Sequence, residues 1–168
     1  KVPPRVIDQR YGRGTVLSEV ANAVIPRTYE QVVEEKELVP LGQPKVEVMA
    51  TRIREINPAC VVHAVADFVT RETLAEYITE QLDAVIDCID SVNAKAALIS
   101  WCKRRKIQII ATGGAGGQLD PTQIQVADLN KTFNDPLAAA VRSELRREYG
   151  FSRTPGRYYS VACVFSSE

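Results

Sequence analysis

The sequence predicts an α/β fold built on a doubly wound, mostly parallel sheet that is incomplete. Two observations lead to this class: segments typical of helices and strands alternate from Gly42 onward, and only a few residues connect them. Such alternation favours parallel strands joined by right-handed helical crossovers. The chain has 168 residues, of which 45% are hydrophobic, so one domain with a real core is expected.

Proline placement and helical spacing define the first elements. Pro44 suits the first turn of a helix, where its missing N–H costs nothing, and apolar residues then recur at helical spacing until Asn57-Pro58 ends the run. A β-branched stretch predicts a strand over Cys60–Val65, and Thr70 can cap a second helix. The apolar face of that helix consists of Leu74, Tyr77 and Ile78.

The central elements follow the same alternation. Asp83–Ile89 is the second predicted strand, and its stretch Ala84-Val85-Ile86 is apolar throughout, as in strands covered on both faces. A helix from Ser91 to about Arg105 and a strand over Ile107–Ala111 come next.

The rhythm changes after Gly113. The segment Thr122–Val126 alternates as a strand does, and Asp135-Pro136 combines a helix cap with a first-turn proline, opening a helix to about Tyr149. The last predicted strand is Tyr158–Phe165. A parallel sheet that ends on a strand with nothing to cover it is expected to be unfinished.

Residues 1–41 fit this pattern poorly, because they hold only weak helical patterns and no strong strand. We therefore predict two parts: a divergent N-terminal segment over residues 1–41, and a partial α/β domain over residues 42–168.

Composition excludes several classes of protein. The 21 basic and 21 acidic residues balance, which argues against a surface coated with basic charge but leaves local patches open. The four cysteines form no Cys-x-x-Cys pair and His63 is the only histidine, so nothing supports a structural zinc site. Buried thiols in a reducing cytosol are the expectation. No apolar stretch approaches the ~20 residues that a membrane span needs.

Acidic residues follow two of the predicted strands. Asp90 stands directly before the helix that starts near Ser91, where its carboxylate either caps the helix or binds Mg²⁺ beside phosphates. Asp67 has the same placement after the preceding strand. Asp87 lies inside an apolar strand, so a hydrogen-bonded structural role or a shifted pKa is expected.

Two glycine-rich segments are candidates for phosphate or ligand binding. Gly12-Arg13-Gly14 lacks the preceding strand that a phosphate loop requires. The loop Gly113–Gly117 does follow a strand, and it is either a flexible turn with close backbone approach or the lining of a cleft at a strand end. Lys45, at a helix start, is either a solvated lysine or a cation that faces a bound anion.

Basic and aromatic residues gather near the C-terminus. Five arginines lie between Arg142 and Arg157, with Tyr149, Phe151, Tyr158 and Tyr159 among or beside them. This combination suits an RNA surface, where phosphates are neutralised and unstacked bases contact aromatic rings.

Several motifs together resemble the tRNA threonylcarbamoyladenosine dehydratases, within the superfamily of ubiquitin-activating-type, or ThiF-type, adenylating enzymes. The resemblance covers roughly residues 41–168. It is carried by Leu41–Met49, Ile53–Pro58, Asp67–Thr70, Val85–Val92, Lys95–Ile99 and, most specifically, Thr112–Ile124, followed by Lys131-Thr132, Asp135–Leu137 and Cys163–Ser166.

The resemblance implies a Rossmann-like fold and an ATP-dependent, Mg²⁺-assisted dehydration of the threonylcarbamoyl group on a tRNA adenosine. Lys45 matches the lysine of the family that contacts the triphosphate, and Asp90 matches its metal- and nucleotide-binding aspartate, followed by Ser91. Asp67 is a weaker match at the nucleotide pocket. Arg10, within an opening similar to that of the family, corresponds to an arginine that assists the catalytic site, sometimes across a homodimer. A cytoplasmic location is also implied.

The sequence departs from the family in its first part. The initial strand, the phosphate-binding glycine loop and an Asn-x-x-Arg-Gln segment are not found in residues 1–41, and the C-terminal region of the family is not found after Phe165. Two alternatives therefore stay open beside an active dehydratase. One is a non-catalytic remnant that serves as a dimerisation or tRNA-contact module, and the other is an activator of ubiquitin-like proteins.

Overall fold

A computed structural model describes residues 44–168 of the chain. The chain divides into two compact units, residues 1–67 and residues 68–168. The predicted boundary at residues 41 and 42 falls outside the described residues and stays a prediction. No helix within residues 44–168 has the length and apolar character needed to cross a membrane.

The described part of the first unit contains one helix, α4 (Lys45–Ile56). It begins at Lys45, with Pro44 as its N-cap residue rather than within the first turn as predicted, and ends where the backbone N–H of Asn57 donates to the carbonyl of Ile53 at 2.8 Å. Ala50 is buried. The guanidinium of Arg54 donates to the carbonyl of Val62 at 3.2 Å and so holds the segment after the helix against it.

The strand predicted over Cys60–Val65 is wrong. This segment has no regular secondary structure, and Val61 is 80% exposed. β-Branched residues favour extended backbone mainly through packing against neighbouring strands. Within residues 44–168 this stretch pairs with no strand, so its propensity alone does not make it part of a sheet.

The second unit opens with a single helical turn, α5 (Leu74–Tyr77). The hydroxyl of Thr70 accepts a hydrogen bond from the backbone N–H of Thr73 at 3.3 Å, but the N-cap residue of the helix is Thr73 and not Thr70 as predicted, and the helix stops after Tyr77. Leu74 is buried in the core. The carbonyl of Ile78 accepts a hydrogen bond from the indole N–H of Trp101 at 2.9 Å, which fastens the turn to the next helix.

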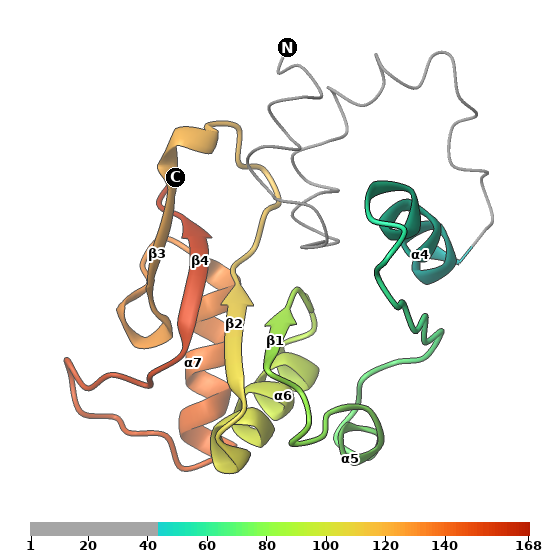
Figure 1. Ribbon diagram of the computed structural model, residues 1–168. Helices are drawn as coiled ribbons and strands as arrows, with labels where there is room; N and C mark the ends of the chain where they lie inside the picture. The colour runs from blue at the N-terminus through green and yellow to red at the C-terminus, as the bar shows by residue number, and fades with distance from the viewer. Residues whose placement is uncertain (1–43) are drawn as a thin grey trace. The chain divides into compact units, whose positions relative to one another are not determined.

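A mixed, mostly parallel sheet forms the centre of this unit (Figure 1). The strand order is β1-β2-β4-β3, in which β1, β2 and β4 are parallel and β3 is antiparallel to β4. The predicted fold class is thereby confirmed. The strands are β1 (Ala84–Asp87), β2 (Gln108–Thr112), β3 (Ile124–Asp128) and β4 (Ala162–Ser166).

The two long helices, α6 (Val92–Arg105) and α7 (Pro136–Glu148), lie side by side behind the sheet in Figure 1. Two short 3₁₀ turns, η1 (Pro121–Gln123) and η2 (Leu129–Lys131), flank β3. The core lies between these helices and one face of the sheet. Its central members are Val85, Ile99, Ile109, Val141, Leu145 and Cys163.

The opposite face of the sheet is less covered than the sequence predicts. Ile86 is 40% exposed, Ile124 48% and Val126 69%. The continuous apolar run in β1 predicted two covered faces, but Val85 and Asp87 are buried whereas Ala84 and Ile86 are exposed. In this unit, therefore, the strand alternates as a half-buried strand does.

Candidate functional site at the carboxyl edge of the sheet

The parallel strands β1, β2 and β4 end at one edge of the sheet, which we call the carboxyl edge. In open α/β sheets this edge is where ligands bind. Ile89 and Asp90 follow β1 there, and the loop Gly113–Gly117 follows β2 (Figure 1).

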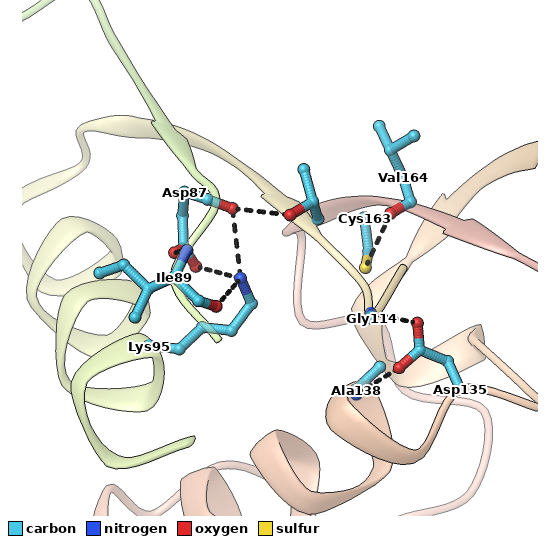
Figure 2. A network of polar contacts seen from close by, with 9 residues as sticks. Asp87, Ile89, Lys95, Gly114, Asp135, Ala138, Cys163 and Val164 are labelled. Atoms are coloured by element: carbon cyan, nitrogen blue, oxygen red, sulfur yellow. Dashed lines mark hydrogen bonds and ion pairs between the residues drawn. The ribbon is translucent and has the colours of Figure 1, made fainter. Parts of the chain in front are cut away.

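A buried ion pair fixes the end of β1. The ammonium of Lys95, on α6, lies 3.1 Å from the Oδ2 atom of Asp87, and both side chains are at most 1% exposed. The same ammonium donates hydrogen bonds to the carbonyls of Asp87 at 3.2 Å and Ile89 at 2.9 Å (Figure 2). The hydroxyl of Thr112, at the end of β2, also donates to the carbonyl of Asp87 at 3.3 Å.

Burial and charge act in opposite directions on the Asp87 carboxyl group. Burial raises its pKa, while the Lys95 ammonium and the backbone N–H of Ile89, which donates to Oδ1 at 3.0 Å, oppose this rise. The contact between Oδ2 and Lys95 is an ion pair without the alignment of a hydrogen bond. The expected structural role of Asp87 with a shifted pKa is confirmed. The ion pair therefore holds the end of β1 in place, and the residues that follow β1 continue from this fixed point.

Asp90 and Ser91 follow the fixed end of β1, and their side chains are exposed. Ser91 is the N-cap residue of α6, and its side chain makes no capping hydrogen bond. Asp90 makes no capping hydrogen bond to any described residue either, so the capping alternative for Asp90 is wrong. The first N–H groups of α6 therefore lack a side-chain acceptor within residues 44–168, and a helix start of this kind favours anions.

The start of the glycine loop is held by Asp135, the N-cap residue of α7. Its Oδ1 atom accepts from the backbone N–H of Ala138 at 2.8 Å, and its Oδ2 atom accepts from the backbone N–H of Gly114 at 2.9 Å (Figure 2). The backbone N–H of Gly113 donates to the carbonyl of Val164 at 2.8 Å. The predicted cap is confirmed, and its second role is to anchor the loop.

Gly113 is required by close approach rather than by backbone angle. A Cβ atom here would overlap the Oδ2 atom of Asp135 and lie 2.9 Å from its Cγ atom and 3.0 Å from the Cβ of Phe165. Gly116, in contrast, has open space around it. The loop thus combines a tightly packed start with an exposed tip. The predicted close backbone approach is confirmed, and the role of the loop as the lining of a cleft stays a prediction.

The other predicted site residues lie elsewhere in the chain. Lys45 is exposed at the first turn of α4, and Asp67 is exposed at the end of the same unit. Because the two units are described separately, the meeting of Lys45 and Asp67 with Asp90 stays a prediction. Arg10 lies outside the described residues and also stays a prediction.

Lys95 is a positioning residue that was not predicted from the sequence. A signal was present, because Lys95 is a charged residue on the mostly apolar buried face of α6, beside Ala96 and Ile99. A lysine on such a face needs an acceptor, and Asp87 on the preceding strand is the nearest acidic residue within a buried strand. Among the described residues, no group of three or more His, Cys, Asp or Glu side chains could hold a metal ion.

Comparison with known proteins identifies the family of this chain. The ThiF family model matches residues 31–154 of the chain. The chain belongs to the ThiF family. This agrees with the mixed, mostly parallel sheet.

Named relatives of this ThiF-family chain are tRNA threonylcarbamoyladenosine dehydratases. The Haemophilus influenzae protein is 52% identical over 128 residues, which are 76% of this chain and 49% of that protein. Among solved structures, Escherichia coli tRNA N6-threonylcarbamoyladenosine dehydratase, TcdA, in complex with ATP has a TM-score of 0.72 and 54% identity. That match covers 76% of this chain and 52% of the other, and a complex with AMP matches equally. The chain thus spans about half the length of these relatives.

A second similarity concerns a shorter stretch. Over 48 residues, 29% of the chain, this ThiF-family protein is 58% identical to trigger factor of Kineococcus radiotolerans, and the match covers 10% of that protein. Two unrelated kinds of relative therefore match parts of one chain.

Proposed function

We propose that this chain carries the adenylation site of a tRNA threonylcarbamoyladenosine dehydratase and binds ATP at the carboxyl edge. The observation that carries the proposal is the exposed Asp90 carboxylate, which follows a strand end fixed by the Asp87–Lys95 pair. Relatives with this name and the TcdA complexes with ATP and AMP support it. A homodimer and a cytoplasmic location belong to the same proposal.

The proposed reaction has two steps, each with its own leaving group. First, the carboxylate of the threonylcarbamoyl group attacks the α-phosphorus of ATP, so that an acyl–phosphate bond forms and pyrophosphate leaves. An internal nucleophile of the same modification then attacks the activated acyl carbon, closes a ring and expels AMP. Because an anion must approach a polyanion, the site has to offset negative charge.

Three features of the chain suit this requirement. In the proposal, the ammonium of Lys45 contacts the triphosphate, and the first N–H groups of α6 face a phosphate. The Asp90 carboxylate is a hard oxygen donor, the kind of ligand that Mg²⁺ accepts together with phosphate oxygens and water. The residues present therefore fit Mg²⁺, which would supply further charge neutralisation. Asp67 and Ser91 line the nucleotide pocket in this proposal, and Arg10 assists catalysis.

The test is tRNA-dependent ATP–pyrophosphate exchange. The wild-type chain is expected to catalyse the exchange. Lys45→Ala and Asp90→Ala are each expected to lower the exchange rate at least 100-fold, as does removal of one charge-stabilising group. Lys45→Arg is expected to keep part of the wild-type rate. Asp83→Ala is the matched control, because Asp83 is an exposed acid just before the same strand and far from the carboxyl edge. Absence of exchange from a folded preparation supplied with Mg²⁺ and modified tRNA would refute the proposal.

A second candidate is a non-catalytic remnant that contacts tRNA or a second copy. The trigger factor similarity favours it, because 48 residues, 29% of the chain, match a protein with a different name. Loss of three charge-assisted hydrogen bonds to phosphate, at ~1.5–3 kcal/mol each, would weaken ATP binding by roughly 10³–10⁶-fold. Calorimetric titration separates the candidates: micromolar ATP binding excludes the remnant, and no binding at millimolar ATP favours it.

A further inference from the structure

A basic hollow of about 290 Å³ lies at the other edge of the sheet, where α6 and α7 end and β4 begins. We call it the basic hollow. It is formed by three segments of the second unit: the last turn of α6, the residues after α7 and the segment before β4. Its lining includes Lys103, Arg104, Arg157 and the aromatic residues Tyr149, Phe151 and Tyr158.

The charge of the basic hollow is uncompensated. Among the residues that the structure describes, no acidic side chain lines it. Lys103 donates to the carbonyl of Ser160 at 3.1 Å, whereas Arg104 and Arg157 are exposed and form no ion pair with any described residue. Two guanidinium groups on one concave surface favour a phosphate-bearing ligand, because each offers a planar fork of donors to phosphate oxygens.

The floor of the basic hollow is rigid. Tyr159 is buried, its ring packs edge-on against Phe151 with centroids 4.9 Å apart, and its hydroxyl donates to the carbonyl of Ser152 at 3.0 Å. The side chain of Arg146 donates to the same hydroxyl at 2.8 Å. The cations at the rim are therefore carried by a backbone that is already ordered before a ligand binds, which lowers the entropic cost of binding.

An aromatic ring at the rim is open to solvent. Tyr158 is 68% exposed, and the ammonium of Lys131 lies 5.3 Å from its ring centroid. An exposed ring beside cations offers a stacking surface for a base whose phosphates are neutralised next to it.

The position of the basic hollow separates it from the carboxyl edge. The 14 residues of α6 connect the two edges, and at 1.5 Å per residue they span about 20 Å. A nucleotide bound near Asp90 does not reach that far, whereas a folded RNA does. We propose that the basic hollow is a second RNA contact, with phosphates on Arg104 and Arg157 and an unpaired base or ribose against Tyr158. This inference deepens the proposed function, since it rests on a tRNA substrate.

The test uses the full chain and fluorescence anisotropy with unmodified bulk tRNA at several salt concentrations. Arg104→Ala/Arg157→Ala is expected to weaken tRNA binding at least tenfold and to lower the salt slope by about 1–2, because each lost phosphate contact removes ~0.7–0.9 from it. Tyr158→Ala is expected to weaken binding with little change in slope. Arg153→Ala is the matched control, because this exposed arginine lies between the lining segments but does not line the hollow. Thermal unfolding verifies that each variant folds.

The outcomes distinguish this inference from the proposed function. If wild type and the double variant bind tRNA equally, the basic hollow is not an RNA contact, while the adenylation proposal stands. If the double variant loses tRNA binding but retains its affinity for ATP, the inference is supported independently of catalysis. If wild type binds ATP but no tRNA, both the inference and the tRNA substrate are refuted. If polyglutamate competes with tRNA as well as polyuridylate does at equal charge, the surface recognises acidic chains and the RNA assignment is overturned.

Discussion

At the scale of single residues, the carboxyl edge depends on atoms packed too closely for substitution. Gly113 leaves no space for a methyl group beside Asp135, and Asp135 both caps α7 and holds the N–H of Gly114. One added carbon would therefore disturb a helix start and a loop together. This is a stronger constraint than the sequence alone indicates, because Asp135 lies 21 positions after Gly114.

We predict that Gly113→Ala lowers the free energy of unfolding by about 1–3 kcal/mol, the usual cost of overpacking. Gly116→Ala is the control, since its Cβ would meet nothing within 4 Å, and it should change stability by no more than about 0.5 kcal/mol. Urea titration of both variants measures the difference. Equal stability of the two would show that Asp135 moves aside freely.

Two thiols should resist alkylation in the folded chain. Burial raises the pKa of Cys102 to about 11 and that of Cys163 to about 12. At pH 8 the reactive thiolate is therefore roughly 10⁻³ to 10⁻⁴ of each population. We predict that iodoacetamide leaves both unmodified at pH 8 until denaturant is added, as followed by peptide mass spectrometry. Rapid labelling of either thiol without denaturant would contradict their burial.

The same thiols predict a loss of stability at alkaline pH. Their folded pKa values lie above the ordinary value of 9.0, so the unfolded chain releases these protons first as pH rises. Their contribution is complete below pH 9 and declines as pH rises toward 11–12, by about 1.4 kcal/mol per pH unit for each thiol. Cys163→Ala should show a shallower decline than wild type between pH 9 and 10.5 in denaturant titrations. Parallel pH profiles would show that Cys163 does not contribute.

At the scale of elements, β1 and α6 are joined by charge as well as by apolar packing. The Lys95 ammonium contacts Asp87 and the carbonyl of Ile89, so the helix and the end of the strand share one polar centre. A buried pair is costly to split, because the remaining charge loses its partner without regaining water. This centre fixes where Asp90 leaves the sheet.

A double-mutant cycle tests this centre. Lys95→Met is expected to lower the free energy of unfolding by about 3–5 kcal/mol. Asp87→Asn keeps the acceptor for the N–H of Ile89 but weakens the pair, and the double variant should be more stable than the sum of the two changes predicts, by at least ~1 kcal/mol. Thermal and urea unfolding measure the change in the free energy of unfolding for each single variant and for the double variant. Strict additivity would mean that the pair contributes no coupling.

Also at the scale of elements, local signals predicted most of the second unit. The cap and proline at Asp135 and Pro136 fixed the start of α7, and the strand at Ala84–Asp87 lies within its predicted range. Tertiary pairing was not predictable in the same way. Cys60–Val65 has strand propensity but pairs with no strand among the described residues. The antiparallel direction of β3 follows from its pairing with β4. Lys95 and Thr112 were missed because their roles depend on contacts that Asp87 makes with the packed helix α6 and with the neighbouring strand β2.

At the scale of the whole molecule, two similarities meet in one chain. The dehydratase-like part agrees with a described sheet and site, and the trigger factor match accounts for 29% of the sequence. The predicted site residues also fall into two groups. Asp90, Ser91 and the glycine loop lie in one described unit, whereas Arg10 lies outside the described residues.

The exposed face of the sheet gives the last prediction. Ile86, on β1, and Val126, on β3, present β-branched side chains on the face opposite α6 and α7, at the two outer strands of the sheet, and exposed apolar surface promotes association. We expect the 168-residue chain to self-associate as its concentration rises in sedimentation velocity runs. Ile86→Thr/Val126→Thr should shift this association to at least tenfold higher concentration without loss of stability, since threonine keeps strand propensity. Val61→Thr, an exposed residue outside the sheet, should have no effect. A wild-type chain that stays monomeric at every concentration would show that this face does not self-associate.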